Sequence, residues 1–184
     1  MVKQYFFPNQ QSIPPLIHQQ IVDFLRIVWP EGFKGENRLR TWISKDEFHP
    51  VSFVFVEDDN LMSHTEVVWK YLKHEGITYK TYGLSGVLTY PQFRKQGYGL
   101  KLIKIAKEYI EKQDGDIVMF GSKITGFYEK AGFEKMNKVI VLKGDPKKPE
   151  KSDEDAYMFF LSEKGRNGKK AFETKPVYFG EDTW

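Results

Sequence analysis

The chain has 184 residues, of which 40% are hydrophobic and 16% aromatic, a composition typical of a globular protein. Its 28 Lys and Arg residues against 25 Asp and Glu residues give a formal net charge of +3, too small to indicate nucleic acid or a membrane surface as a partner. The absence of cysteine excludes disulfides, thiolate zinc sites and a cysteine nucleophile.

The first fifteen residues contain no apolar run of signal-peptide length, and no stretch approaches the roughly 20 apolar residues of a membrane span. The four histidines show no metal-ligand spacing. We therefore expect a cytoplasmic protein that binds neither a membrane, nor nucleic acid, nor a metal ion.

Apolar residues at helical spacing predict a first helix over residues 12–28. Ser12 is its predicted cap, Pro14 and Pro15 suit the first turn, and Pro30 ends the segment. Residues 31–44 are compatible with either a short helix or a loop.

Three β-rich runs follow, separated by turn-forming residues in "EDDN" and "KHEG", and predict an antiparallel meander over residues 51–90. Gly83 and Gly86 in the third run indicate a bulge or a close backbone approach. The period then changes: apolar positions from Leu102 to Ile110 predict a helix, and "DIVMFGS" predicts a short buried strand.

In the remainder, "KITGFYEKAGF" predicts a short helix with Gly132 as its C-cap. "NKVIVLKG" and "AYMFFLS" predict two strands with a charged loop between them, and a tail from about residue 163 begins as a loop and ends in aromatics. With no repeat or second core, residues 1–184 are predicted to form a single domain of α+β class with a mostly antiparallel sheet.

The stretch Arg94–Gly99 points to an anion-binding loop. It does not match the P-loop pattern, and "GYGLKL" lacks the third glycine of the dinucleotide fingerprint. It does match the pattern R/Q-x-x-G-x-G/A between a strand and a helix. Small residues there let backbone N–H groups surround a pyrophosphate, and the helix N-terminus adds partial positive charge.

With "GVLTYPQFRKQGYGLKLI" and "ITGFYEKAGFEK", the chain resembles the GCN5-related N-acetyltransferase (GNAT) family. The resemblance implies a twisted sheet flanked by helices, with acetyl-CoA as co-substrate bound at a splayed strand pair. Tyr128 falls where the family often has a tyrosine facing the thioester sulfur. The cofactor-binding residues implied by the resemblance are Val87, Leu88, Thr89, Arg94, Lys95, Gln96, Gly97, Tyr98 and Gly99.

The chain also resembles, more weakly, the aminoglycoside 2'-N-acetyltransferases, in "MSHTEVVWKYL", "ITYKTYGLSGV" and the terminal "YFGEDTW". That subgroup carries a glutamate as base on the strand before the acetyl-CoA motif, where this chain has Ser85. Glu66 and His64, two apart on a strand, are the candidate replacements. Trp184 is a candidate substrate-binding residue.

Together these features predict acetyl transfer from acetyl-CoA to a primary amine of a small molecule, with an aminoglycoside-like molecule as one candidate, by direct attack on the thioester. Tyr128 would protonate the leaving thiolate, and a backbone N–H of Leu88 or Thr89 would stabilise the oxyanion. Two alternatives stay open: a non-catalytic acyl-CoA sensor, and an acetyltransferase of a protein or peptide amine. A homodimer is a further possibility.

Overall fold

The computed structural model describes residues 1–181 and divides by its internal contacts into two compact units. Unit 1 comprises residues 1–68 and 85–106, and unit 2 the remainder. Three elements run through both units: β3 (Asn60–His74), β4 (Ile77–Thr89) and α2 (Tyr98–Glu111). The single domain expected from the sequence stays a prediction. None of the described helices is long and apolar enough to cross a membrane.

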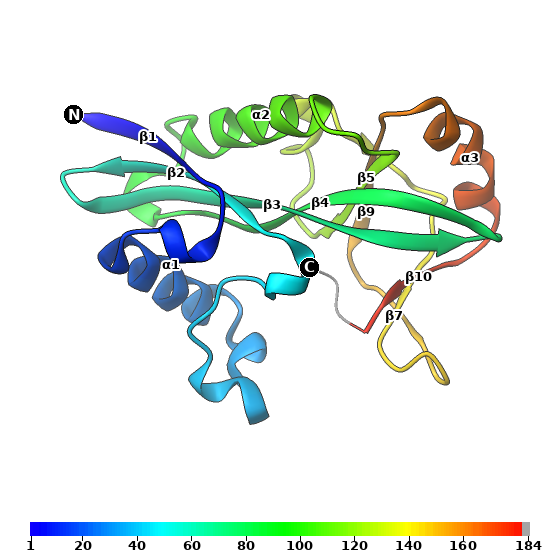
Figure 1. Ribbon diagram of the computed structural model, residues 1–184, viewed down its shortest axis with the longest axis horizontal. Coiled ribbons are helices and arrows are strands. Elements are labelled where there is room, and N and C mark those ends of the chain that lie inside the picture. The colour runs from blue at the N-terminus through cyan, green and yellow to red at the C-terminus, as the bar shows by residue number, and fades with distance from the viewer. Residues whose placement is uncertain (182–184) are drawn as a thin grey trace. The chain divides into compact units, whose positions relative to one another are not determined.

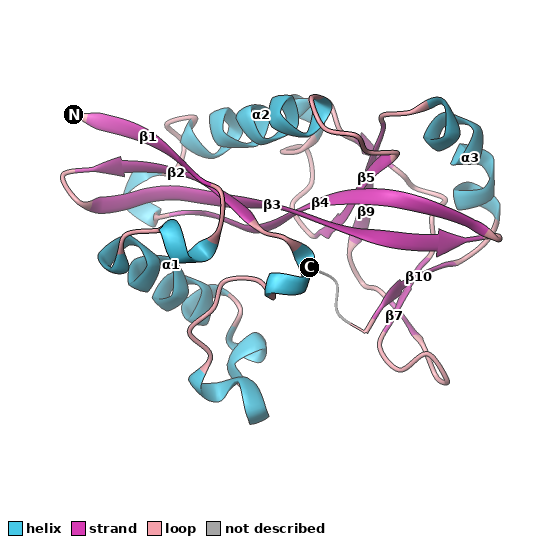
Figure 2. Ribbon diagram, viewed as in Figure 1, coloured by secondary structure: helices cyan, strands magenta, loops and turns pink. Residues whose placement is uncertain are grey.

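The sheet of unit 1 has the strand order β1-β2-β3-β4 (Figures 1 and 2). β2 (Val51–Glu57) pairs antiparallel with β3, and the predicted turn between them contains Asp58 and Asp59 with positive φ. The predicted meander is therefore confirmed. The sequence did not indicate β1 (Val2–Phe7), an edge strand that is exposed over Lys3–Phe6 and pairs antiparallel with β2.

The first helix, α1, runs from Pro15 to Val28. The prediction that Ser12 caps this helix was wrong. Ser12 belongs to a preceding 3-10 turn (Gln10–Ser12), which is capped by Asn9, and α1 begins after Pro14. The ambiguous segment that follows forms two 3-10 helices, Pro30–Phe33 and Gly35–Leu39. A further 3-10 turn covers Asp46–Phe48.

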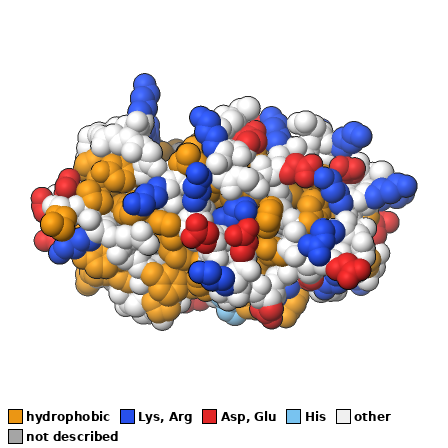
Figure 3. Space-filling model, turned by 90° about the horizontal axis from the view of Figure 1, so that it is seen from above, with side chains coloured by type: hydrophobic (Ala, Val, Ile, Leu, Met, Phe, Trp, Pro, Cys, Tyr) orange, Lys and Arg blue, Asp and Glu red, His pale blue; other side chains and the backbone are white. Residues whose placement is uncertain are grey.

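Two helices cover opposite faces of the unit 1 sheet (Figure 1). Residues of α1 such as Ile21 and Leu25 pack in one buried cluster with Val54, Leu61 and Leu88 of the sheet. On the other face the ring of Tyr98, at the start of α2, lies 5.7 Å from that of Phe55. Figure 3, the view from the side on which α2 lies, shows Lys and Arg interspersed with Asp and Glu.

In unit 2 the sheet continues in the order β3-β4-β5-β9-β6. The predicted strand β5 (Ile117–Ser122) pairs in parallel with β4, and β9 (Asp155–Phe160) pairs antiparallel with β5. A mostly antiparallel sheet with helices is thus confirmed as the fold class. The short strands are β6 (Glu134–Lys135), and a separate three-stranded sheet of β10 (Val177–Gly180), β7 (Val141–Lys143) and β8 (Glu150–Lys151).

Two predictions for unit 2 were wrong. The tail begins as helix α3 (Glu163–Thr174), capped by Ser162, rather than as a loop. The sequence did not indicate this helix because it contains Gly165 and Gly168, which lower helix propensity. Both glycines are buried against other parts of unit 2. The predicted short helix over 123–133 is a turn followed by one 3-10 turn (Glu129–Ala131). Gly132 does terminate it, with φ +84°.

Candidate active site

The loop between β4 and α2 has the backbone geometry of an anion site. Residues 94–97 are exposed, Lys95 and Gly97 have positive φ, and α2 begins at Tyr98. Nothing lies within 4 Å of the position that a Cβ on Gly97 would take, so the backbone is open to a ligand. The first amides of α2 have no intrahelical partners, and the helix dipole favours an anion there.

Two side chains of this loop form hydrogen bonds to nearby backbone, one to the last residue of β4 and one within the loop. Arg94 donates from Nε to the carbonyl oxygen of Thr89 at 3.0 Å, and Gln96 donates to the carbonyl of Gln92 at 2.9 Å. These bonds fix the stems of both side chains. The loop therefore combines a charged guanidinium with exposed backbone amides, the donor set that a pyrophosphate requires.

The end of β4 that precedes the loop is tied to β3 by a buried hydroxyl. Ser63 Oγ lies 2.8 Å from the carbonyl oxygen of Leu88 and 2.9 Å from Thr89 Oγ1. Val87 and Thr89 are half-buried, whereas Leu88 is buried in the core. The predicted cofactor strand is thus held in place from one side.

His64 contacts Gly86, a residue of positive φ inside β4. The imidazole Nδ1 lies 2.7 Å from the carbonyl oxygen of Gly86, which has φ +54°. A carbonyl can only accept, so Nδ1 carries the proton. Burial lowers the pKa of His64 to about 4, so the ring is neutral at pH 7, and its Nε2 faces Ser52 Oγ at 3.4 Å. His64 acts here as a structural hydrogen-bond donor.

Glu66 lies on the same strand face as His64, as expected from their spacing, and both are 0% exposed. Ser52 donates to Glu66 Oε1 at 3.3 Å, while Oε2 has no hydrogen-bond partner. Burial raises the pKa of Glu66 to about 7, against the opposing effect of the Ser44 and Ser52 hydroxyls. A fully buried carboxyl cannot itself contact an incoming amine.

Ser85, at the position where the sequence comparison expects a glutamate, contacts Ser44 with an Oγ–Oγ distance of 3.0 Å. Ser44 is held by Gln10, which donates to its carbonyl at 2.6 Å and accepts from the amide of Ile43 at 2.7 Å. Sequence reasoning missed Ser44, Ser52 and Gln10. No local signal marks them, because only the fold brings their distant segments to β3 and β4.

In unit 2, Tyr128 lies at the start of the 3-10 turn and is 4% exposed. Its ring packs against those of Phe120, Phe127 and Tyr157, with centroids 4.8 to 5.2 Å apart. Burial raises its pKa to about 12, although the Ser122 hydroxyl lowers it. A tyrosine in this state keeps its proton at neutral pH and can serve as a hydrogen-bond donor or acid, not as a base.

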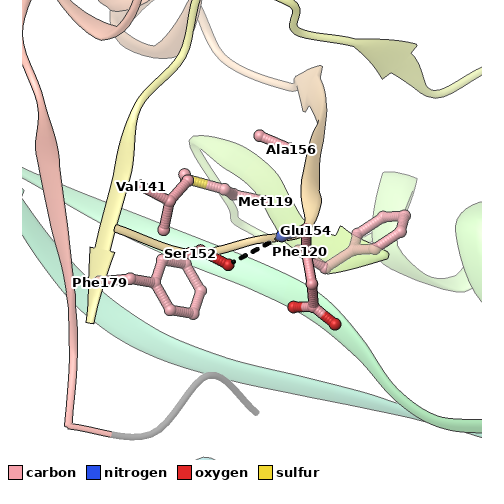
Figure 4. A pocket seen from close by; sticks show the side chains of 8 residues that line it. Met119, Phe120, Val141, Ser152, Glu154, Ala156 and Phe179 are labelled. Carbon is pink, nitrogen blue, oxygen red and sulfur yellow. Dashed lines mark hydrogen bonds between the residues drawn. The ribbon is translucent and has the colours of Figure 1, made fainter. Parts of the chain in front are cut away.

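Unit 2 also contains a crevice with about 250 Å³ of empty space, part of it open to solvent. Its lining residues include Glu154 and the apolar Met119, Val141 and Phe179, and Figure 4 shows the Glu154 carboxylate directed away from Met119 and Val141. A Cβ on Gly121 would lie 2.4 Å from Glu154 Oε2, so glycine at 121 is what allows the carboxylate to lie there. The predicted substrate residue Trp184 is outside the described residues.

The acetyltransferase (GNAT) domain family matches residues 17–136, which is more than half of the chain and includes both motifs. The chain belongs to this family of acetyltransferases. The resemblance seen in the sequence is therefore confirmed, and the predicted anion-binding loop, β4 and Tyr128 all lie within the matched GNAT region.

Solved structures share the fold. An aminoglycoside 6'-N-acetyltransferase complexed with coenzyme A has a TM-score of 0.59 at 16% identity, over 88% of this chain and 97% of that one. A GNAT family N-acetyltransferase from Escherichia coli in complex with CoA has a TM-score of 0.56 at 13% identity, over 97% of this chain and 88% of that one. At these identities the likeness shows the fold alone.

A probable N-acyltransferase from Enterococcus faecalis V583, described as a conserved protein of unknown function, has a TM-score of 0.58 at 17% identity. That match covers 74% of this chain and 33% of the other. The chain spans about a third of the length of this structure and of three further longer ones. No curated protein matches the sequence significantly.

Proposed function

We propose that this chain transfers the acetyl group of acetyl-CoA to a primary amine of a small molecule, by direct attack of the neutral amine on the thioester. The observation that carries the proposal is the Arg94–Gly99 loop at the start of α2, within the matched GNAT region. Its positive-φ backbone, exposed amides and Arg94 suit the pyrophosphate of CoA.

The cofactor would lie along Val87–Thr89 and the loop. The amide of Leu88 or Thr89 would donate to the oxyanion of the tetrahedral intermediate. Tyr128, whose pKa is raised to about 12, would donate a proton or a strong hydrogen bond to the departing thiolate. No covalent enzyme intermediate is needed, which agrees with a chain that lacks cysteine.

We propose a small acceptor amine, with aminoglycoside-like amines as the first candidates. The support is the weak sequence resemblance to the 2'-N-acetyltransferases, together with two solved structures of aminoglycoside 6'-acetyltransferases among the fold neighbours. Acetylation of a protein or peptide amine is the competing choice. The predicted homodimer and the cytoplasmic location stay predictions.

A second candidate, a non-catalytic acyl-CoA sensor, is favoured by two observations. The candidate base residues Glu66 and His64 are both fully buried, and Ser85 stands where the aminoglycoside subgroup carries its glutamate. Such a protein would keep the loop and bind acetyl-CoA without turnover.

Release of free CoA from acetyl-CoA, measured against aminoglycosides, polyamines, amino acids and lysine peptides, tests the proposal. Turnover with one amine class supports the transferase and identifies its acceptor. Tight binding of acetyl-CoA by calorimetry without turnover across the panel would favour the sensor. Absence of binding would refute both.

A further inference from the structure

The carboxyl of Glu66 is enclosed but incompletely hydrogen-bonded. It is 0% exposed, Oε1 is 3.3 Å from Ser52 Oγ, and Oε2 has no partner. The charged groups that act on it are Arg40, which favours the carboxylate, and Asp46, which opposes it. A buried carboxylate that only hydroxyl groups contact, with one oxygen left without a hydrogen bond, is costly to a fold, so its retention calls for a use.

A pair of hydroxyls connects this carboxyl to a less buried position. Ser44 is 3% exposed and its hydroxyl acts on the Glu66 carboxyl, while its Oγ lies 3.0 Å from Ser85 Oγ. Ser85 is half-buried on β4, directly before Gly86 with its positive φ. The hydroxyls of Ser85 and Ser44 therefore lead inward from the cofactor strand to Glu66.

We propose that Ser85 and Ser44 relay a proton from the acceptor amine, directly or through one water, to Glu66. The proposal rests on the acetyltransferase function above. In the step, the amine nitrogen gives its proton to Ser85 Oγ, Ser85 gives its own to Ser44 Oγ, and Ser44 gives its own to the Glu66 carboxylate. One proton leaves the amine and one arrives at Glu66, and no oxidant or metal is needed.

Ser52 lets Glu66 hold either protonation state. Because His64 uses its Nδ1 proton on Gly86, its neutral Nε2 is an acceptor, and the single Ser52 proton can go either to Nε2 at 3.4 Å or to Glu66 Oε1 at 3.3 Å. An ionised Glu66 accepts from Ser52. A protonated Glu66 releases Ser52 to donate to His64. Each state thus leaves the buried hydroxyl with a partner.

The titratable and charged groups near Glu66 do not hold its carboxyl permanently ionised or permanently neutral. His64 is neutral, Arg40 and Asp46 act in opposite directions, and burial leaves the pKa of Glu66 at about 7. A proton acceptor with that pKa suits catalysis at neutral pH. The rate of the wild-type chain should accordingly rise with pH through about 7.

The test uses the full chain and the amine that the CoA-release panel identifies. Ser85→Ala should lower kcat by roughly 10²-fold or more, with KM for acetyl-CoA unchanged, and should abolish the rise near pH 7. Ser85→Thr, which keeps the hydroxyl, should retain most of kcat. Thr81→Val is the matched control, because Thr81 is a buried hydroxyl of β4 outside the relay, and it should leave kcat unchanged.

A second experiment moves the carboxylate from position 66 to position 85, where the relay begins. Glu66→Gln should lose activity as Ser85→Ala does, and the double variant Glu66→Gln with Ser85→Glu should regain part of it. Wild-type turnover with Ser85→Ala equal to Thr81→Val in rate and pH profile would overturn the relay while leaving the transferase intact. Absence of turnover in the wild type with every amine would instead refute the proposed function itself.

Discussion

The His64 ring and the backbone of Gly86 are in mutual contact: Nδ1 lies 2.7 Å from the Gly86 carbonyl oxygen, and a Cβ on Gly86 would lie 3.0 Å from His64 Cε1. Gly86→Ala would therefore add a steric cost to the strain of φ +54°. We expect a loss of about 2–3 kcal/mol in the free energy of unfolding, measured by urea denaturation.

Gly76 provides the control for that substitution. It has φ +77° and no atom within 4 Å of a built Cβ, so Gly76→Ala should cost only the conformational part, about 1 kcal/mol. In a His64→Ala background the extra cost of Gly86→Ala should shrink. Equal losses of unfolding free energy for Gly86→Ala and Gly76→Ala would show that the contact with His64 does not contribute to the effect at Gly86.

The stability of unit 1 should depend on pH through Glu66. Its pKa is raised from an ordinary 4.5 to about 7, so between these values the folded state binds a proton that the unfolded state has lost. The stabilisation is complete below pH 4.5 and is lost as pH rises to about 7, by about 3 kcal/mol. His64 has the opposite effect, because its pKa is lowered to about 4 and stability falls as pH drops below about 6.5.

Glu66→Gln separates the two contributions. The difference in free energy of unfolding, variant minus wild type, should grow in favour of the variant between pH 5 and pH 7.5, because only in the wild type does the folded state hold a carboxyl proton that the unfolded state has released. Glu47→Gln, at an exposed site, should give a difference that does not change with pH. A pH-independent difference for Glu66→Gln would mean that Glu66 does not titrate in this range.

Tyr128→Phe should lower kcat roughly 10- to 100-fold while leaving the Kd of acetyl-CoA unchanged, because the ring keeps its aromatic neighbours and only the hydroxyl is lost. Tyr157→Phe is the matched control in the same cluster; its hydroxyl donates to the carbonyl of Ile124 at 3.1 Å. Steady-state kinetics of both variants give the two values of kcat. If both substitutions lower kcat equally, Tyr128 does not act as the acid.

Arg94→Ala should raise the Kd for CoA about tenfold or more, and the remaining affinity should depend less steeply on salt, because a charge-assisted contact is lost. Titration calorimetry at two salt concentrations measures both effects. Lys104→Ala removes a positive charge from the exposed side of α2 and should leave binding unchanged. A similar loss for both variants would indicate only a general field effect.

Gly168→Ala tests the packing of α3. Alanine normally stabilises a helix, but here a Cβ would lie 2.4 Å from Tyr79 Oη, so we expect a net loss of about 1–3 kcal/mol in the free energy of unfolding. Asn167→Ala, exposed on the same helix, should instead stabilise slightly. Removal of the hydroxyl by Tyr79→Phe should reduce the loss of unfolding free energy caused by Gly168→Ala. An unchanged loss would show that the clash with Tyr79 Oη is not its cause.

Prediction from sequence succeeded where local pattern and tertiary packing agree. The meander of β2, β3 and β4 alternates apolar runs with turn residues, and α2 has an uninterrupted apolar stripe. Prediction failed where contacts with a distant segment of the same chain determine the structure. β1 is a mostly exposed edge strand that is ordered by pairing with β2, and α3 carries two glycines that only the close approach of Asp116 and Tyr79 explains.

The sequence by itself determined the family and predicted an anion-binding loop over residues 94–99, because the loop motif is contiguous and lies directly at the start of α2. Only the tertiary structure decided how Glu66 is placed. It buries that carboxyl, leaves one oxygen without a partner, and brings Ser44 and Ser52, 22 and 14 residues away in the chain, to the same cluster as Ser85. No local pattern encodes such a cluster, since its members come from separate segments and burial alone changes their chemistry.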